Sequence, residues 1–172
     1  PGSTNISMVA SMQQDPFFEM YSCVDERSAA YMAVGLAAET NEPVVITCTG
    51  ATASRNYLPA LTEAYYRKLP ILAVTGTQYE GRIGDLHSQL IDRSSIQKDV
   101  AVLSVHIPGL VETSSFEEKR HAQVEMNRAI TALTRHGGGP VHINLQTLYS
   151  WDFSVAKLPE VKMVRRMTYG TV

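Results

Sequence analysis

The feature of this sequence that most limits its fold is a regular alternation of short apolar runs with longer stretches of helical period. The apolar runs are rich in β-branched residues and almost continuous, as strands buried on both faces require. They are Phe17–Val24, Pro43–Thr49, Pro70–Gly76, Val100–Ile107 and Gly137–Leu145. The helical stretches are Glu26–Glu39, Ala53–Arg67 and Ser115–Arg135. The alternation predicts an α/β fold, with a mostly parallel sheet sandwiched by helices.

The chain has 172 residues, 44% of them hydrophobic, which is enough for one compact core and too little for two generous domains. We expect one domain over residues 1–149 and a linker toward a following domain over residues 150–172, where the alternation stops. Because the sequence opens with "PGSTN" and no initiator Met, we expect either a piece of something longer or a free-standing subunit.

Charge and composition exclude several functions. The net charge is −2 and the charged residues are mixed in sign, so we expect no nucleic-acid partner and no binding to an acidic membrane surface. No apolar run approaches the roughly 20 residues of a membrane span. Cys23 and Cys48 lie in apolar runs and not at metal-ligand spacing, so we expect buried thiols, no metal site and a cytoplasmic location.

The acidic pair Asp25 and Glu26 stands where an apolar run gives way to a helix. As an ordinary helix start, Asp25 would be the N-cap and Glu26 would complement the helix dipole, by about 0.3–1 kcal/mol at an exposed site. The surrounding residues are apolar, however, and favour a buried turn at the edge of the sheet. A buried carboxyl group could share a proton with a ligand nitrogen. The residues alone leave both interpretations open.

A second loop that could bind a ligand is "CTGATASRN", a strand end followed by small residues and a helix. Small residues let a ligand approach the backbone. The loop is neither a G-x-G-x-x-G fingerprint nor a P-loop. It is equally consistent with a tight strand-to-helix turn capped by Thr52 or Ser54. In a parallel sheet, both loops would lie at the carboxyl ends of the strands, where ligands bind.

Together these stretches resemble a known family. The segment "DERSAAYMAVGLAAETNEPVVITCTGATASRNYLPALTEAYYRKLPILAVTG" is similar to the pyrimidine-binding (PYR) domain of thiamine-diphosphate-dependent enzymes, in particular the acetohydroxyacid synthase and menaquinone-pathway SEPHCHC synthase groups. "PGS" resembles the turn that ends the family's first strand, and "GGGPVHINL" resembles its closing strand. The family's first helix and strand, which precede "PG", have no counterpart here.

The resemblance implies a site. Glu26 matches the glutamate that hydrogen-bonds N1′ of the cofactor's aminopyrimidine and so activates C2 of the thiazolium. Thr49 and Asn56 match the two ends of the following loop, although Gly50 stands one place earlier than the family's glycine. The other residues expected to line the pyrimidine or the substrate are Pro1, Gly2, Thr52, Ala53 and Gln89.

The resemblance also implies what this chain lacks. The family holds the diphosphate through Mg²⁺ on a G-D-G…N motif in a second domain, and Gly84-Asp85-Leu86 does not match that motif. We therefore expect a diphosphate-binding domain from the same or another chain, a homodimer or tetramer, a small 2-oxo acid as substrate, and no activity of this chain alone.

Two other classes stay open: a non-catalytic binding or oligomerisation module derived from the same domain, and an unrelated nucleotide-binding domain. The second lacks the glycines and the ribose-binding acid that it needs. His87 is interpreted as a solvated loop histidine. Arg55 is interpreted as a surface arginine, or as a contact for an acidic substrate or partner.

Overall fold

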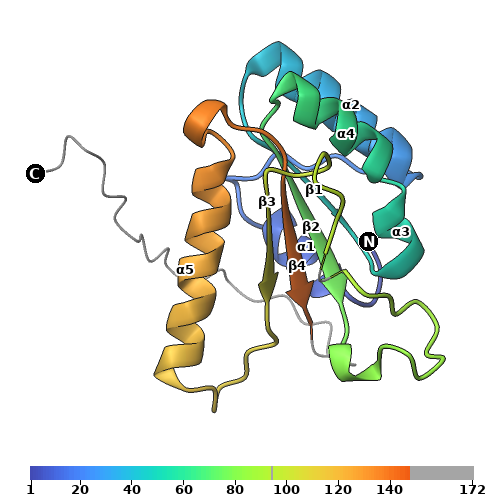
Figure 1. The fold of residues 1–172 in the computed structure, drawn as a ribbon, viewed down its shortest axis with the longest axis vertical. Helices are drawn as coiled ribbons and strands as arrows, with labels where there is room; N and C mark the ends of the chain where they lie inside the picture. Colours follow the sequence, from blue (N-terminus) through green and yellow to red (C-terminus); the bar gives the residue numbers. More distant parts are fainter. Residues whose placement is uncertain (94, 148–172) are drawn as a thin grey trace, which may run out of the picture.

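The structure is a computed structural model that describes residues 1–93 and 95–147, which form a parallel sheet with helices on both faces (Figure 1). In chain order the elements are α1 (Ile6–Gln13), α2 (Glu26–Thr40), β1 (Val44–Cys48), α3 (Ala51–Arg55), α4 (Leu58–Arg67), β2 (Ile71–Thr77), the 3₁₀ turn η1 (Glu80–Arg82), β3 (Leu103–Ile107), α5 (Phe116–Ala132), the 3₁₀ turn η2 (Arg135–Gly137) and β4 (Val141–Gln146). The predicted linker, residues 150–172, lies outside the described residues.

The strands of the described region run parallel in the order β1-β2-β4-β3. Val44 of β1 lies opposite Ile71, and Leu72 of β2 lies opposite Val141 of β4. All residues of the central strand β2 are buried, as its continuous apolar run predicted. The predicted α/β fold with a parallel sheet is therefore confirmed.

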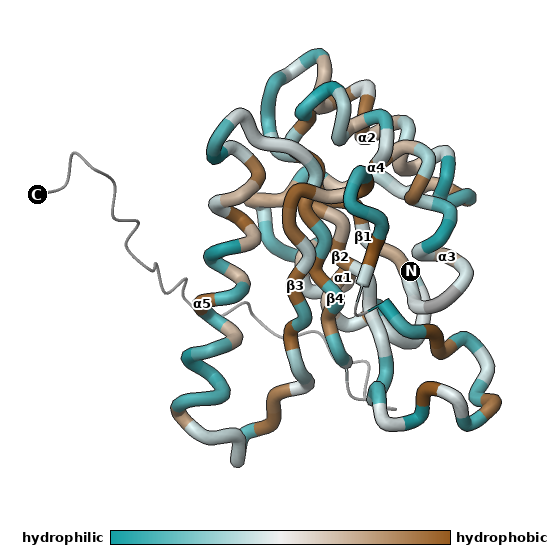
Figure 2. The backbone as a smooth tube through the Cα atoms, in the orientation of Figure 1, coloured by the Kyte–Doolittle hydropathy of each residue, from teal (hydrophilic) through white to brown (hydrophobic). Residues whose placement is uncertain are grey.

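Alternate residues of β2 serve two separate cores. Ile71 and Ala73 pack with apolar residues of α2 and α4, whereas Leu72 and Val74 pack with those of α5. Figure 1 shows α2 and α4 over one side of the sheet and α5 along the other. Figure 2 shows apolar residues concentrated on the strands, while α5 carries many polar residues. All strand-to-helix connections therefore emerge at one edge of the sheet.

Local chemistry sets where the long helices begin. The carboxylate of Asp25 accepts a hydrogen bond from the backbone N–H of Ser28 at 2.8 Å, which confirms Asp25 as the N-cap of α2. α5 begins with a capping box, in which Ser115 and Glu118 bond each other's backbone N–H groups. These bonds also lower the pKa of the Glu118 carboxyl.

The single helix predicted over Ala53–Arg67 is wrong, because the structure divides it into α3 and α4. Pro59 explains the division. Proline has no N–H to donate to the carbonyl of Arg55, and its ring would clash with that carbonyl in a continuous helix. Pro59 is instead accommodated in the first turn of α4, where the missing donor costs nothing.

The strand predicted over Phe17–Val24 is also wrong. Within the described residues this segment pairs with no other strand, and the side chains of Phe17 and Val24 are exposed. An apolar run forms a strand only where a neighbour completes its ladder of backbone hydrogen bonds. The other predicted elements exist with shifted ends, and α1 was not predicted.

Of the two cysteines, Cys48 is buried as expected, but Cys23 is exposed because its run is not a strand. In the described part of the chain, no helix has the length and apolar character needed to cross a membrane. Residues 1–93 and 95–147 also contain no group of three His, Cys, Asp or Glu side chains arranged to hold a metal ion.

Candidate cofactor-binding site

Two predicted site residues from different helices meet at the carboxyl edge of the sheet. Glu26 stands in the first turn of α2, and Asn56 follows the last residue of α3. The Asn56 side-chain amide donates a hydrogen bond to Oε2 of Glu26 over 3.3 Å. Both side chains are half-buried. The site therefore contains a carboxylate that is partly withdrawn from water and oriented by a fixed donor.

The neighbouring Asp25 has a different role. Its carboxylate is exposed and accepts hydrogen bonds from both the backbone N–H and the hydroxyl of Ser28, each at 2.8 Å. These two bonds favour the ionised form and lower the pKa of Asp25. Because Asp25 provides the helix cap, the carboxylate of Glu26 can turn toward Asn56.

Behind this pair lies a buried apolar wall. Tyr57, which is 1% exposed, hydrogen-bonds Cys48 at the end of β1. Burial raises the pKa of the Cys48 thiol to about 11, and it also raises the pKa of the Tyr57 hydroxyl. Both groups are therefore uncharged at neutral pH, so the wall offers Glu26 no ionic partner.

The opening turn of the chain packs directly against Thr49. A Cβ atom on Gly2 would lie only 2.5 Å from Cγ2 of Thr49, so this approach requires glycine. Asn5, which is 2% exposed, holds the turn in place: its Oδ1 accepts from the N–H of Gly2 at 2.9 Å, and its Nδ2 donates to Thr47 at 3.2 Å. Pro1 is exposed beside this turn.

Gly50 is where three connections meet. A Cβ atom at this position would lie 3.2 Å from the carbonyl oxygen of Gln89 and 3.2 Å from that of Gly76. The turn after β1, the end of β2 and the long loop after β2 are therefore in contact. Thr52 is exposed on α3, whereas Ala53 is buried beneath it.

Gln89 reaches the site through its backbone. Its φ of 63° lies in the left-handed region, and its side chain is exposed. The structure thus brings Gln89 next to the turn that carries Thr49 and Gly50. A role for its side chain at a reaction centre stays a prediction.

One residue of this region that the sequence patterns do not indicate is Arg93. Its guanidinium is almost fully buried and bonds Ser54, the carbonyl of Gly76 and Asn144. A lone arginine within "DRSSI" carries no motif. The only sequence signal was its position just after the loop that bears Gln89.

The two strand histidines, His106 and His142, both have hydrogen-bond partners. His142 is buried, with its ring nitrogens 2.8 Å from the hydroxyl of Thr75 and 2.9 Å from that of Ser104. Burial, with the charges of two nearby arginines, lowers its pKa to about 4, so it is neutral at pH 7. His106 lies at the edge and contacts Asn144 and Glu80.

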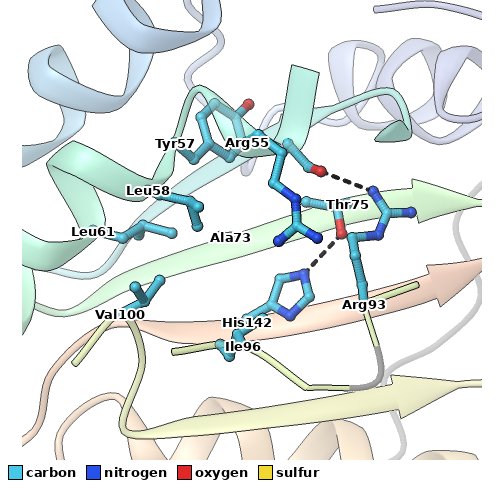
Figure 3. Close-up of a pocket in the computed structure, with 11 residues that line it drawn as sticks. Arg55, Tyr57, Leu58, Leu61, Ala73, Thr75, Arg93, Ile96, Val100 and His142 are labelled. Carbon is cyan, nitrogen blue, oxygen red and sulfur yellow. Dashed lines mark hydrogen bonds between the residues drawn. The ribbon is translucent and has the colours of Figure 1, made fainter. Parts of the chain in front are cut away.

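A small pocket lies on the other side of α3, between α3, α4 and the sheet (Figure 3). The residues around it are Ser54, Arg55, Tyr57, Leu58, Leu61, Ala73, Thr75, Arg93, Ile96, Val100 and His142. These include neither Glu26 nor Asn56. Arg55 is exposed and donates to the backbone carbonyl of Asp92 at 3.2 Å. His87 is exposed, as predicted.

Comparison with known proteins decides what this arrangement belongs to. Residues 1–113 match the family described as thiamine pyrophosphate enzyme, N-terminal TPP binding domain. The chain belongs to this family. The predicted resemblance is thereby confirmed, and with it thiamine diphosphate as the cofactor of the family.

Several similar curated proteins carry the name 2-succinyl-5-enolpyruvyl-6-hydroxy-3-cyclohexene-1-carboxylate synthase. The protein of that name from Bacteroides thetaiotaomicron is 34% identical over 167 residues, which are 96% of this chain and 30% of that protein. The one from Desulfotalea psychrophila is 37% identical over 161 residues, 92% of this chain and 30% of the relative. The chain thus spans about 30% of the length of these two relatives.

Proposed function

We propose that Glu26 is the carboxylate with which this domain activates thiamine diphosphate, by hydrogen-bonding N1′ of its aminopyrimidine. The observation that carries the proposal is the hydrogen bond from Asn56 to Glu26, 3.3 Å long and half-buried. This bond orients the carboxylate of Glu26, the residue that the sequence resemblance predicts to activate the cofactor. A merely exposed helix-start glutamate would have no such partner.

The residues present fit an aminopyrimidine. Glu26 provides the acceptor for a ring nitrogen, and the turn after β1 consists of small side chains that permit close approach. The carbonyl groups of Gln89 and Gly76 occupy the space next to Gly50 where a Cβ would point. The turn after β1 and the loop that carries Gln89 are therefore in contact without a ligand. In the proposed site, Thr49, Thr52, Ala53 and Asn56 line the pyrimidine, with Pro1 and Gly2 beneath it and Gln89 toward the substrate.

When bound, thiamine diphosphate supplies the electron sink for breaking or forming a bond next to a carbonyl. The contribution of this chain is to hold the pyrimidine and to exchange a proton at Oε2 of Glu26. Tyr57 and Cys48, both buried and near enough to Glu26 to feel its charge, would limit the water around that carboxylate in the proposed site. A drier environment strengthens the hydrogen bond on which activation depends.

The parent reaction that we propose begins with decarboxylation of a small 2-oxo acid and joins the remaining fragment to an acceptor. The name of the relatives, a cyclohexene-carboxylate synthase, favours this transferase or lyase chemistry over simple decarboxylation. An acetolactate-synthase-like reaction is the second candidate, on the sequence resemblance alone.

In this proposal, the diphosphate of the cofactor is bound by a different domain. Gly84, Asp85 and Leu86 lie exposed in the loop after η1 and do not form the family's metal-binding motif. Mg²⁺ would therefore be held by a diphosphate-binding domain of the same chain or of a partner in a homodimer or tetramer. The relatives, more than three times as long as the matched segment, have room for such a domain. This chain alone would then be inactive.

The test is Glu26→Gln in the natural polypeptide that carries this sequence. Exchange of the cofactor's C2 proton, followed by NMR in deuterated water, should fall by about 10²-fold or more, in line with loss of an acid–base group. Glu39→Gln, an exposed change at the far end of the same helix, is the control and should leave the rate unchanged.

Wild-type exchange in Glu26→Gln would refute the proposed role. If the wild type itself neither binds thiamine diphosphate nor speeds its exchange, the domain serves instead as a non-catalytic binding module.

A further inference from the structure

The guanidinium of Arg93 is the point at which three segments of the sheet edge are tied together. Its Nε donates to Oδ1 of Asn144 on β4, one terminal nitrogen donates to the hydroxyl of Ser54 on α3, and the other donates to the carbonyl of Gly76 on β2, each over 3.1 Å. Only 4% of the residue is exposed. Figure 3 shows this side chain reaching across the sheet toward α3.

This arrangement is costly for an arginine, because all three acceptors are neutral. Withdrawing the charge from water lowers the pKa of Arg93. The carboxylate of Glu80 joins this network through Asn144, which donates to its Oε1 at 3.2 Å. A guanidinium suits this position because its donors, fixed in one plane, can bond three differently placed acceptors at once.

Two of the three bonds lead to segments of the candidate site. Ser54 stands two residues before Asn56, the donor to Glu26. The carbonyl of Gly76, which accepts from Arg93, also lies against Gly50. Arg93 itself follows the loop that carries Gln89 past that same glycine.

We infer that Arg93 is a positioning residue for cofactor activation. It locks α3, the end of β2 and the Gln89 loop into one arrangement, and thereby sets the distance from Asn56 to Glu26. This inference rests on the proposed function for its consequence, but the geometric part stands on the structure of the chain alone. Arg93 belongs to neither apolar core, so its effect should concentrate at this edge of the sheet.

The experiment compares Arg93→Lys with Arg128→Lys in the natural polypeptide. Lysine keeps the charge but lacks the planar set of donors, whereas Arg128 is exposed on α5 and forms an ion pair with Glu125. With thiamine diphosphate at saturation, C2 proton exchange should fall at least tenfold in Arg93→Lys and stay unchanged in Arg128→Lys. Saturation and normalisation to folded protein remove effects of affinity and of folded fraction. Exchange within twofold of wild type would overturn the inference.

A second measurement keeps the claim testable without the cofactor. Amide hydrogen exchange in Arg93→Lys should accelerate about tenfold at Asn56, whose N–H donates to the carbonyl of Ala53, while the amides of α5 stay protected. Equal acceleration throughout the chain would mean that Arg93 only adds global stability, and it would overturn the inference. This outcome is independent of whether wild-type protein activates thiamine diphosphate.

Should Arg93→Lys fail to fold, Ser54→Ala decides the question. It removes the one acceptor on α3, and it should accelerate exchange at the Asn56 amide severalfold while sparing α5. Unchanged exchange at Asn56 in this variant would also overturn the inference.

Discussion

Asn56 and Glu26 lie thirty residues apart in the sequence, and a hydrogen bond of 3.3 Å joins the amide of the first to the carboxylate of the second. The bond links the first turn of α2 to the break between α3 and α4. Neither helical segment alone would fix the carboxylate, because Glu26 belongs to α2 and Asn56 to the turn between α3 and α4. The pair therefore reports on how well these two helical segments are assembled on one side of the sheet.

Removing the donor should weaken the site without destroying the fold. In Asn56→Ala, cofactor-saturated C2 proton exchange should fall by about 10–100-fold, since a hydrogen bond to a charged group contributes about 1.5–3 kcal/mol. Asn56→Asp has nearly the same shape but places two carboxyl groups in contact, so its rate should be lower still. A rate in Asn56→Asp equal to that of wild type would contradict the assignment of this bond.

The contact between Gly2 and Thr49 predicts a compensating pair. Gly2→Ala should lower affinity for thiamine diphosphate, because its Cβ would meet Cγ2 of Thr49 at 2.5 Å and push the opening turn away. Thr49→Ser removes that methyl group, so the double variant should recover most of the affinity. Calorimetric titration of the four proteins of this cycle measures the coupling. Additive losses would show that the turn does not pack on Thr49.

His142 predicts a pH-dependent stability. Its pKa is about 4 in the folded chain against an ordinary 6.5, so between these values the unfolded chain binds a proton that the folded chain does not. The free energy of unfolding therefore rises with pH across this window. The contribution is fully present above pH 6.5 and is lost as pH falls toward 4, with a total of about 3 kcal/mol.

Urea unfolding of wild type and His142→Gln between pH 4.5 and 7 measures this contribution. Carboxyl groups titrate in both proteins, so the difference between the two slopes isolates the histidine. The slope of the free energy of unfolding against pH measures the number of protons bound on unfolding, and in the variant it should be smaller by up to one proton. Parallel curves would mean that His142 is not buried in its neutral form.

The two cysteines should react very differently with a thiol reagent. Cys23 is exposed, whereas Cys48 is 4% exposed and burial raises its pKa to about 11. Native protein should therefore label rapidly at one site only, and both sites should label in urea. Peptide mapping identifies the modified residue. Fast native labelling at Cys48 would contradict the packing of β1 against Tyr57.

Local patterns predicted most of the fold correctly. The continuous apolar run of β2 reflects burial on both faces, which is a property of the residues themselves. The Asp25 cap and the start of α5 likewise follow from side chains within four residues of the helix end. The division between α3 and α4 also has a local cause in the sequence, Pro59.

Errors arose where structure depends on partners distant in sequence. Phe17–Val24 has the composition of a strand, but composition does not supply the neighbour that a strand needs. The predicted site contained Glu26 and Asn56, which the structure joins, because family motifs preserve spacing along the chain. Arg93 was invisible because its importance lies in three contacts with segments 17 to 51 residues away.

Because β2 packs against both cores, it limits where this domain can gain or lose residues. Because neighbouring residues of β2 face opposite cores, inserting one residue would exchange Ile71 and Ala73 with Leu72 and Val74, and would turn the Gly76 carbonyl away from Gly50 and Arg93. A single insertion there would spoil both layers and the cofactor edge together. The exposed loop from Arg82 to Ser88 has no such alternation to preserve. Additions to this domain are therefore expected in that loop, and the length of β2 should be the dimension that stays fixed.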